Sequence, residues 1–156
     1  MILNLGCGNL PLGGAVNHDI VRHAPWVDVA HDLNIIPWPW ANNEFDTIKA
    51  WAVLEHLHRE RISIINECWR ILKPGGLLVV KLPYWNSEDS HDDLTHYWFT
   101  TLHQFDQFDP TTERGRRYGF YTPFKWRLVS SKFSSAGHSS IVHKLMKIIR
   151  FMEVGQ

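Results

Sequence analysis

Short apolar runs alternate with polar turns along the first half of the chain. Runs at 2–5, 15–20, 27–33 and 45–51 each lean apolar and end on or beside a polar residue. The run at 77–83 is the most apolar of all, which is typical of a central strand that is buried on both faces. The pattern therefore predicts a sheet built from short strands.

One segment between the last two runs has the period of a helix. Apolar residues recur at helical spacing between residues 54 and 72, namely Leu54, Leu57, Ile62, Ile65, Trp69 and Leu72. Pro74, Gly75 and Gly76 follow directly, and residues of this kind end helices. Strands that alternate with a helix in this order predict an α/β fold with a mostly parallel sheet.

The connections between the first strands are short for such a fold. About nine residues lie between the first and second runs and about seven between the second and third. A parallel crossover usually needs about a dozen or more. We therefore predict a Rossmann-like, mostly parallel sheet with shortened or missing crossover helices near the N-terminus. Because bare apolar surface usually finds a partner, we expect a second copy of the chain or another protein to cover the exposed sheet edge.

The pattern changes after residue 83. A polar loop begins near residue 86, and residues 124–133 read as a strand or hairpin arm. Residues 139–154 predict a basic amphipathic helix with Ile141, Leu145, Ile148 and Met152 on one stripe. That helix could dock on its own domain, on a partner or on a membrane.

Size and composition limit the function classes. The chain has 156 residues, 44% of them hydrophobic and 21% charged, which suits one globular domain over residues 1–156. We divide it into a core at 1–83 and a substrate-side part at 84–156. The net charge of zero gives no strong signal for nucleic-acid binding.

Cellular location and redox chemistry follow from the same composition. The two cysteines, Cys7 and Cys68, have no paired spacing, so neither a disulfide framework nor a zinc motif is indicated. The first residues lack the basic lead and long apolar stretch of a signal peptide. No run approaches the roughly 20 apolar residues of a membrane span. We expect a cytoplasmic protein.

Polar residues and glycines follow the predicted strand ends, where ligands bind in open α/β sheets. Gly6 and Gly8 flank Cys7 directly after the first strand, and glycine there allows positive φ and a close approach by a ligand. Asp19 follows the second strand, where a carboxylate can accept both hydrogen bonds from a ribose diol. An ordinary turn and a turn-capping aspartate explain these residues as well.

The spacing of the glycines argues against a nicotinamide cofactor. The dinucleotide fingerprint requires a third glycine that opens a helix under the pyrophosphate, and here that position is Pro11. A ligand with a nucleoside but no pyrophosphate suits this loop better.

Four ordered segments resemble the motifs of class I S-adenosylmethionine-dependent methyltransferases. These are LNLGCG, the acidic end of VNHDI, HDLNIIPWPWANNEFDTIKAWAVLEHL and ECWRILKPGGLLVVKLP. The closest resemblance is to the small type 11-like members, and it spans residues 2–83. DDLTHYWFT resembles a segment common after the fifth strand of short members. Asn4 replaces the commoner aspartate of the first strand, and the usual helix before that strand is lacking.

The resemblance implies S-adenosyl-L-methionine as cofactor and nine residues that bind it. Gly6, Cys7 and Gly8 would lie along its methionine part, and Asp19 would hold the ribose with Ile20 against the adenine. Asp32 and Leu33 would meet the adenine edge, and Ala50 and Trp51 would lie near the sulfonium.

Methyl transfer from a sulfonium is an in-line displacement, and a general base helps when the acceptor is a hydroxyl or protonated amine. The candidate catalytic residues are His56, Asp93 and His96, although His56 could equally orient a loop or cap a helix. The segment HDDLTH could in principle hold a metal, but a solvated acidic loop explains it as well, so we predict no metal site.

We therefore predict an enzyme, a methyltransferase that acts on an unidentified acceptor, most simply a small molecule. The sequence AWAV stands where many amino-group methyltransferases of nucleic acids have [DN]-P-P-[YF], which argues against DNA adenine methylation. Two alternatives stay open: a cofactor-binding partner protein with weak or no activity, and another reaction such as cleavage of the cofactor.

Overall fold

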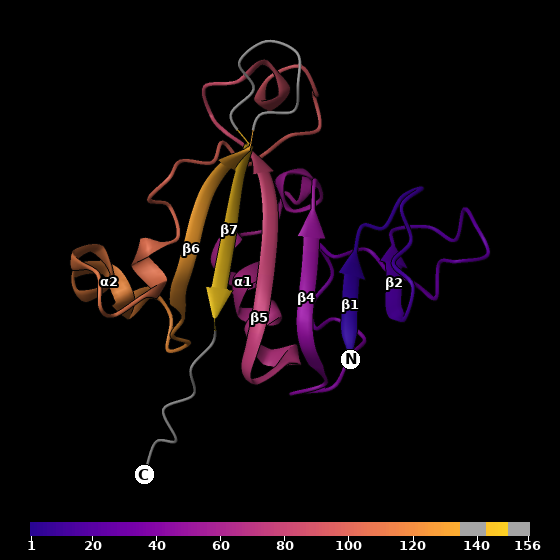
Figure 1. The fold of residues 1–156 in the computed structure, drawn as a ribbon, viewed down its shortest axis with the longest axis horizontal. Helices are drawn as coiled ribbons and strands as arrows, with labels where there is room; N and C mark the ends of the chain where they lie inside the picture. Colours follow the sequence, from indigo (N-terminus) through magenta and orange to yellow (C-terminus); the bar gives the residue numbers. More distant parts are fainter. Residues whose placement is uncertain (135–142, 150–156) are drawn as a thin grey trace.

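A seven-stranded sheet forms the centre of the protein (Figure 1). The computed structural model describes residues 1–134 and 143–149. The strand order is β3-β2-β1-β4-β5-β7-β6. The strands are β1 (Ile2–Leu5), β2 (Ala15–Asp19), β3 (Val29–Ala30), β4 (Phe45–Trp51), β5 (Leu72–Pro83), β6 (Arg127–Ser134) and β7 (His143–Ile149). The first five run parallel, and β7 is antiparallel to both of its neighbours. The predicted α/β fold with a mostly parallel sheet is confirmed.

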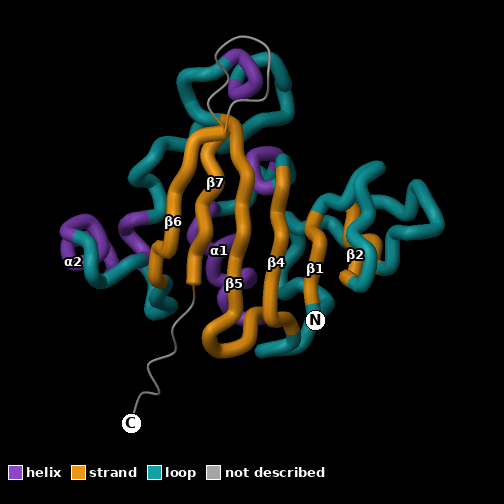
Figure 2. Tube along the Cα trace, viewed as in Figure 1, coloured by secondary structure: helices purple, strands orange, loops and turns teal. Residues whose placement is uncertain are grey.

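Helices are few in the described part of the chain. Two α-helices and four short 3₁₀ turns are present: α1 (Arg61–Ile71), α2 (Glu113–Tyr118), η1 (Leu54–His56), η2 (Glu88–Ser90), η3 (Asp106–Phe108) and η4 (Gly119–Tyr121). Residues 6–44 contain no helix, and Figure 2 shows only loops around β1 and β2. The prediction of missing crossover helices near the N-terminus is confirmed. Nowhere in residues 1–134 or 143–149 is a helix long and apolar enough to cross a membrane.

The predicted helix over residues 54–72 is wrong in its first part. The chain forms η1, then extends at Leu57, and α1 begins only at Arg61. The carbonyls that would continue a helix have other partners. The Glu55 carbonyl accepts the Tyr97 N–H at 2.7 Å, and the Leu57 carbonyl accepts the Trp98 indole N–H at 2.7 Å. Long-range hydrogen bonds therefore override the local helical period here.

The predicted C-terminal amphipathic helix is also wrong where the structure describes it. Residues 143–149 form β7, which pairs with β5 on one side and β6 on the other. A strand in that position supplies hydrogen-bond partners to the backbone of two neighbours, which an α-helix cannot do. Residues 139–142 and 150–154 of the prediction lie outside the described residues. The predicted strand at 124–133 corresponds to β6.

The core lies between the sheet and α1. Ile48 and Ala50 of β4 and Leu78 and Val80 of β5 are fully buried, as are four apolar or sulfur-containing side chains of α1, namely Ile64, Ile65, Cys68 and Ile71. Intervening strand residues such as Lys49 are only partly buried, as expected for side chains that alternate between sheet faces. Figure 1 shows α1 behind the sheet and no helix in front of β1, β4 and β5.

Candidate functional site

Two cavities lie at the carboxyl ends of the parallel strands, beside the point between β1 and β4 where the strand order reverses. We call the first the glycine-loop cavity. Its volume is about 330 Å³, near the lower end of the roughly 300–1,000 Å³ common for ligand sites. It is lined by Gly6, Gly8, His18, Asp19, Ile20, His31, Asp32, Leu33, Asn34, Ala52, Val53, His56 and Leu57.

The loop after β1 needs its first glycine. Gly6 has φ +60°, and a Cβ at this position would lie 2.6 Å from a methyl carbon of Val53. Gly8 also has positive φ, +49°, but a Cβ there would meet nothing within 4 Å. The backbone of this loop therefore passes close to Val53, and Gly6 fits there because it lacks a side chain.

Asp19 joins the ends of β1 and β2. Its carboxylate accepts the Gly8 N–H at 2.8 Å through Oδ2 and the Ile20 N–H at 2.8 Å through Oδ1. The Cys7 thiol is a second, weak donor to Oδ2 at 3.9 Å. Because each carboxylate oxygen has two lone pairs, Oδ1 keeps capacity for one further donor, and on Oδ2 a stronger donor could replace the thiol. The half-buried carboxylate is thus held in place by two backbone N–H groups and keeps one free lone pair on Oδ1.

His18 supports the same loop from beneath. Its Nε2 lies 2.9 Å from the His31 carbonyl, which can only accept, and its Nδ1 faces the Gly6 N–H at 3.5 Å. The hydrogen bonds therefore require the neutral tautomer with the proton on Nε2. Burial lowers the pKa of His18, while the bond to His31 opposes the shift.

Asn4 and Asn17 tie the glycine loop to β1 and β2. The Asn4 side-chain amide donates to Asn17 Oδ1 at 2.9 Å, and the Leu12 N–H donates to the same oxygen at 2.8 Å. A deprotonated aspartate at position 4 could not donate this buried hydrogen bond. The asparagine that departs from the family pattern therefore has a structural role here.

Six of the nine predicted cofactor-binding residues line the glycine-loop cavity: Gly6, Gly8, Asp19, Ile20, Asp32 and Leu33. Cys7, Ala50 and Trp51 are not among the lining residues. Cys7 and Ala50 are buried, and the ring of Trp51 lies under the ammonium group of Lys49, 3.7 Å from it.

Other residues that line the glycine-loop cavity were not predicted from sequence, among them His18, His31, Ala52 and Val53. Ala52 and Val53 directly follow the end of β4, so the strand-end rule could have found them. Nothing in the sequence indicates that Ala52 has φ +50°.

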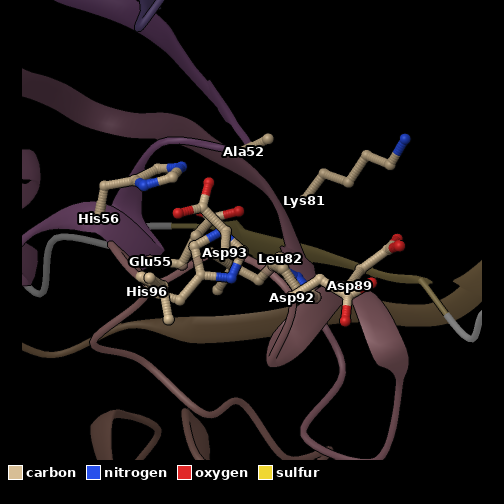
Figure 3. Close-up of a pocket in the computed structure, with 11 residues that line it drawn as sticks. Ala52, Glu55, His56, Lys81, Leu82, Asp89, Asp92, Asp93 and His96 are labelled. Carbon is tan, nitrogen blue, oxygen red and sulfur yellow. The ribbon is translucent and has the colours of Figure 1, made fainter.

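The second cavity, which we call the acidic cavity, shares Ala52 and His56 with the first. Its volume is about 690 Å³. Figure 3 shows Glu55, His56, Asp93 and His96 gathered at one end, with Lys81 and Asp89 at the other. Its lining residues are Ala52, Glu55, His56, Lys81, Leu82, Pro83, Asp89, Asp92, Asp93, Leu94 and His96.

Hydrogen bonds to the main chain of Glu55 and Tyr97 bring the two sides of the acidic cavity together. The Glu55 carbonyl accepts the Tyr97 N–H, and Arg61 donates to the Tyr97 carbonyl at 2.9 Å. This docking of residues 91–98 on η1 places the rings of His56 and His96 with centroids 4.6 Å apart. The three predicted catalytic residues, His56, Asp93 and His96, all line this cavity.

A chain of hydrogen bonds fixes the tautomer of His56. The Thr95 hydroxyl donates to Asp93 Oδ1 at 2.6 Å, because a carboxylate can only accept. Having given its single proton to Asp93, Thr95 Oγ1 accepts from His56 Nδ1 at 2.7 Å. His56 therefore carries its proton on Nδ1 and a lone pair on Nε2. Burial lowers the pKa of His56, and the neighbouring His96 lowers it further, whereas the charge of Asp93 raises it. The net lowering favours the neutral ring.

Glu55 has no hydrogen-bond partner for either carboxylate oxygen, although it is fully buried. Burial raises its pKa to about 7; the nearby N–H groups of Glu55 and Val53 oppose this, and the charge of Asp93 adds to it. Those N–H groups make no hydrogen bond of normal geometry with the carboxylate. The buried Nδ1 of His96 likewise has no partner.

Comparisons with known proteins agree with this arrangement. A family model described as a methyltransferase domain matches residues 19–80, from the end of β2 into β5. A probable S-adenosylmethionine-dependent methyltransferase of Mycolicibacterium smegmatis is 34% identical to this chain over 59 residues. That match covers 38% of this chain and 22% of the relative, so it spans about a fifth of the relative's length. The predicted resemblance is confirmed.

Solved structures share the fold of this chain. The (4+2)-cyclase SpnF has a TM-score of 0.62 and 14% identity, with 97% of this chain and 75% of that chain covered. The 1,6-didemethyltoxoflavin-N1-methyltransferase of Burkholderia thailandensis, solved with 1,6-didemethyltoxoflavin and S-adenosylhomocysteine, has a TM-score of 0.61 and 13% identity, with 97% and 71% covered. One of these two proteins is a cyclase, so the shared fold does not fix the reaction.

Proposed function

We propose that the chain is an S-adenosylmethionine-dependent methyltransferase that transfers a methyl group to a small-molecule acceptor. The observation that carries this proposal is that two cavities meet at Ala52 and His56, one at the glycine loop and one lined by acids. A methyl donor in the first and an acceptor in the second would face each other across these residues. The bound S-adenosylhomocysteine of the Burkholderia enzyme supports the choice of cofactor.

The glycine-loop cavity is proposed to hold the cofactor. Asp19 would accept the two ribose hydroxyls, one on the free lone pair of Oδ1 and one on Oδ2 in place of the weak Cys7 thiol donor. Asp32 would accept from the adenine amine, with Ile20 and Leu33 against the adenine. Gly6, Cys7 and Gly8 would follow the methionine part, and Ala50 and Trp51 would end the strand nearest the sulfonium. Ala52 lies closer to the shared wall, because it lines both cavities.

The acidic cavity is proposed to hold the acceptor. The lone pair of the acceptor attacks the methyl carbon from roughly 3 Å, the bond from carbon to sulfur breaks, and S-adenosylhomocysteine leaves. His56 is our first candidate for the group that takes a proton from the acceptor, since its Nε2 carries the lone pair. Asp93 acts through Thr95 as a positioning residue, and His96 packs against the ring of His56.

Calorimetric titration with S-adenosylmethionine and with S-adenosylhomocysteine tests the cofactor site. We expect saturable binding of both ligands, weakened roughly 100-fold in Asp19→Ala because two hydrogen bonds to a charged group are lost. Asp46→Ala, which changes an exposed carboxylate at the start of β4, is the control and keeps wild-type affinity. A folded wild-type protein that binds neither ligand would overturn the proposal.

The product of the reaction distinguishes the proposed function from its alternatives. A protein that binds the cofactor is incubated with S-adenosylmethionine and small-molecule acceptor candidates, and the nucleoside products are separated by chromatography. Methyl transfer forms S-adenosylhomocysteine only when an acceptor is present. Products that lack the homocysteine part would indicate cleavage of the cofactor instead, and binding without turnover would favour the partner-protein alternative.

We also propose that a second copy of the chain covers the helix-free edge around β1, β2 and β3. The lack of any helix in residues 6–44 and the exposed side chains of Ile20 and Val21 support this, because bare apolar surface favours association. Analytical ultracentrifugation tests it: a concentration-dependent dimer is expected, and a monomer at all concentrations contradicts it. The expected cytoplasmic location stays a prediction.

A further inference from the structure

Three side chains with metal-binding atoms converge in the acidic cavity, beside the wall that it shares with the glycine-loop cavity. Glu55, His56 and His96 each offer one ligand atom, and these atoms all lie within 4.8 Å of one another. They come from two segments far apart in sequence, η1 and the loop that docks on it. Figure 3 shows them together at one end of the acidic cavity.

Two of these groups are buried without partners. Both oxygens of Glu55 and Nδ1 of His96 have no hydrogen-bond partner, and Glu55 is 0% exposed. Leaving a buried carboxylate without any partner is costly. The three groups share one property, which is that each can donate a lone pair. A cation placed among them would give one atom of each residue a partner.

The third group is oriented from behind. The Asp93–Thr95–His56 chain holds the proton of His56 on Nδ1 and so presents Nε2 as a ligand atom. Imidazoles that bind metals commonly donate their other N–H to an oxygen in this way, which fixes the tautomer and the ring orientation. The hydrogen-bond chain thus provides an outer shell for a metal site.

We propose that Glu55, His56 and His96 bind a divalent transition-metal ion, with Zn²⁺ as the best match. Two imidazoles and one carboxylate are a ligand set that zinc favours, whereas Mg²⁺ and Ca²⁺ prefer oxygen ligands alone. Tetrahedral zinc places its ligand atoms roughly 3.3 Å apart, so the most distant pair would approach by up to about 1.5 Å on binding. A fourth position stays open toward the cavity.

The metal site stands independently of methyl transfer, since it can be measured without the cofactor. It does change the role of His56, because one lone pair on Nε2 cannot both hold an ion and take a proton. In the loaded protein the ion itself would lower the pKa of a hydroxyl bound at the open position. His56 would then act as a ligand.

The test is a titration of the chelator-treated, tag-free chain with Co²⁺ and with Zn²⁺. Co²⁺ is followed by its visible d–d absorption, and Zn²⁺ by calorimetry. We expect one ion per chain for wild type and affinity at least about 30-fold weaker in Glu55→Gln and His96→Gln. The controls are Asp92→Asn, an exposed carboxylate of the same cavity, and His91→Gln, an exposed imidazole of the same loop. Both controls keep wild-type affinity.

Thermal unfolding keeps the test decisive if a variant is less stable. An ion that binds the folded state stabilises it by an amount that grows with the logarithm of its affinity. At a Zn²⁺ concentration near the wild-type Kd, the ion should raise the Tm of wild type and of both controls but not of Glu55→Gln or His96→Gln. The inference is overturned if wild type does not bind either ion. It is also overturned if the two ligand variants bind as well as wild type, or if the controls lose affinity to the same degree.

Discussion

The two cavities differ in whether their buried polar groups have hydrogen-bond partners. Around the glycine loop, the Asp19 carboxylate and the His18 ring have hydrogen-bond partners within the protein. In the acidic cavity, the Glu55 oxygens and His96 Nδ1 have none. The first site is held in its working geometry before a ligand arrives, whereas the second contains buried groups without a partner among the described residues.

This difference separates preorganisation from recognition. A carboxylate already fixed by two backbone N–H groups can accept further hydrogen bonds without losing more freedom, which favours affinity. A buried group without partners destabilises the free protein and gains most when its ligand binds. The proposed cofactor site is therefore expected to depend on backbone geometry, and the acidic cavity on the charge of what enters it.

The largest expected effect on stability concerns two buried glutamate side chains, of which Glu67 has hydrogen-bond partners and Glu55 has none. Glu67 accepts the Trp38 N–H at 2.7 Å and pairs with Arg70 at 2.8 Å. Burial works against its charge, yet the bonds from Arg70 and Trp38 hold the pKa of Glu67 below its usual range. Glu67→Met should cost about 3 kcal/mol, since it removes the carboxylate that pairs with Arg70 and accepts the Trp38 N–H, whereas Glu55→Met should stabilise the metal-free protein by about 1 kcal/mol.

Urea unfolding in the presence of a chelator measures both free energies. Met is close to Glu in volume, so packing changes contribute little to either value. If Glu55→Met destabilised the protein as much as Glu67→Met, Glu55 would have a partner in solution, and the contrast between the two cavities would fail.

The second comparison is between the two glycines of the loop. Both have positive φ, so alanine at either position costs about 1 kcal/mol in backbone strain. At Gly6 the added Cβ also meets Val53 at 2.6 Å, and overpacking of this kind adds about 2 kcal/mol. Gly6→Ala should therefore lose about 3 kcal/mol and Gly8→Ala about 1 kcal/mol in the same unfolding measurement. Equal losses would mean that Val53 moves aside without cost.

The glycine-loop cavity could largely be anticipated from sequence. Three residues of the acidic cavity, His56, Asp93 and His96, were also predicted, but the way they come together with Glu55 was not. Gly6, Asp19 and Asp32 follow strands whose apolar patterns are clear, and strand ends gather at one edge of a parallel sheet. These positions depend on local signals that run in chain order. The course of the chain around Ala52, which has positive φ, has no such signal.

The acidic cavity depends on contacts between distant segments. His96 reaches Glu55 because the Tyr97 N–H bonds to the Glu55 carbonyl, and a main-chain bond of this kind leaves no pattern in the side chains. The same bonds interrupt the predicted helix before Arg61. The wrong prediction at residues 143–149 has a related cause, since pairing with β5 and β6 decides the conformation there.

A smaller effect concerns pH and the paired histidine of the glycine-loop cavity. Because the pKa of His18 is lowered in the fold, the unfolded chain binds more protons as the pH falls. Its contribution to stability is present above the unfolded value of about 6.5 and is lost as the pH falls from there through the folded pKa. Protonated Nδ1 would also face the Gly6 N–H. We expect wild type to lose on the order of 1 kcal/mol more than His18→Gln between pH 7 and 5.

Unfolding free energies at the two pH values check this expectation. His58→Gln removes an exposed imidazole and serves as the control, with the same pH dependence as wild type. An equal acid loss in wild type and His18→Gln would mean that His18 accepts a proton in the fold without penalty.

The smallest expected effect is on the tautomer of His56 in the acidic cavity. Thr95→Val removes the hydroxyl between Asp93 and His56, and nothing then requires the proton to stay on Nδ1. Nitrogen-15 spectra of the imidazoles should show the Nδ1–H form of His56 in wild type and a mixture of tautomers in the variant. Thr111 offers a matched control, because its N–H and hydroxyl bond to Asp109 at 2.9 and 2.7 Å with no histidine attached. Thr111→Val should leave the His56 signal unchanged. A His56 signal that stays in the Nδ1–H form in Thr95→Val would mean that another group sets the tautomer. The hydrogen-bond chain from Asp93 through Thr95 would then not orient His56.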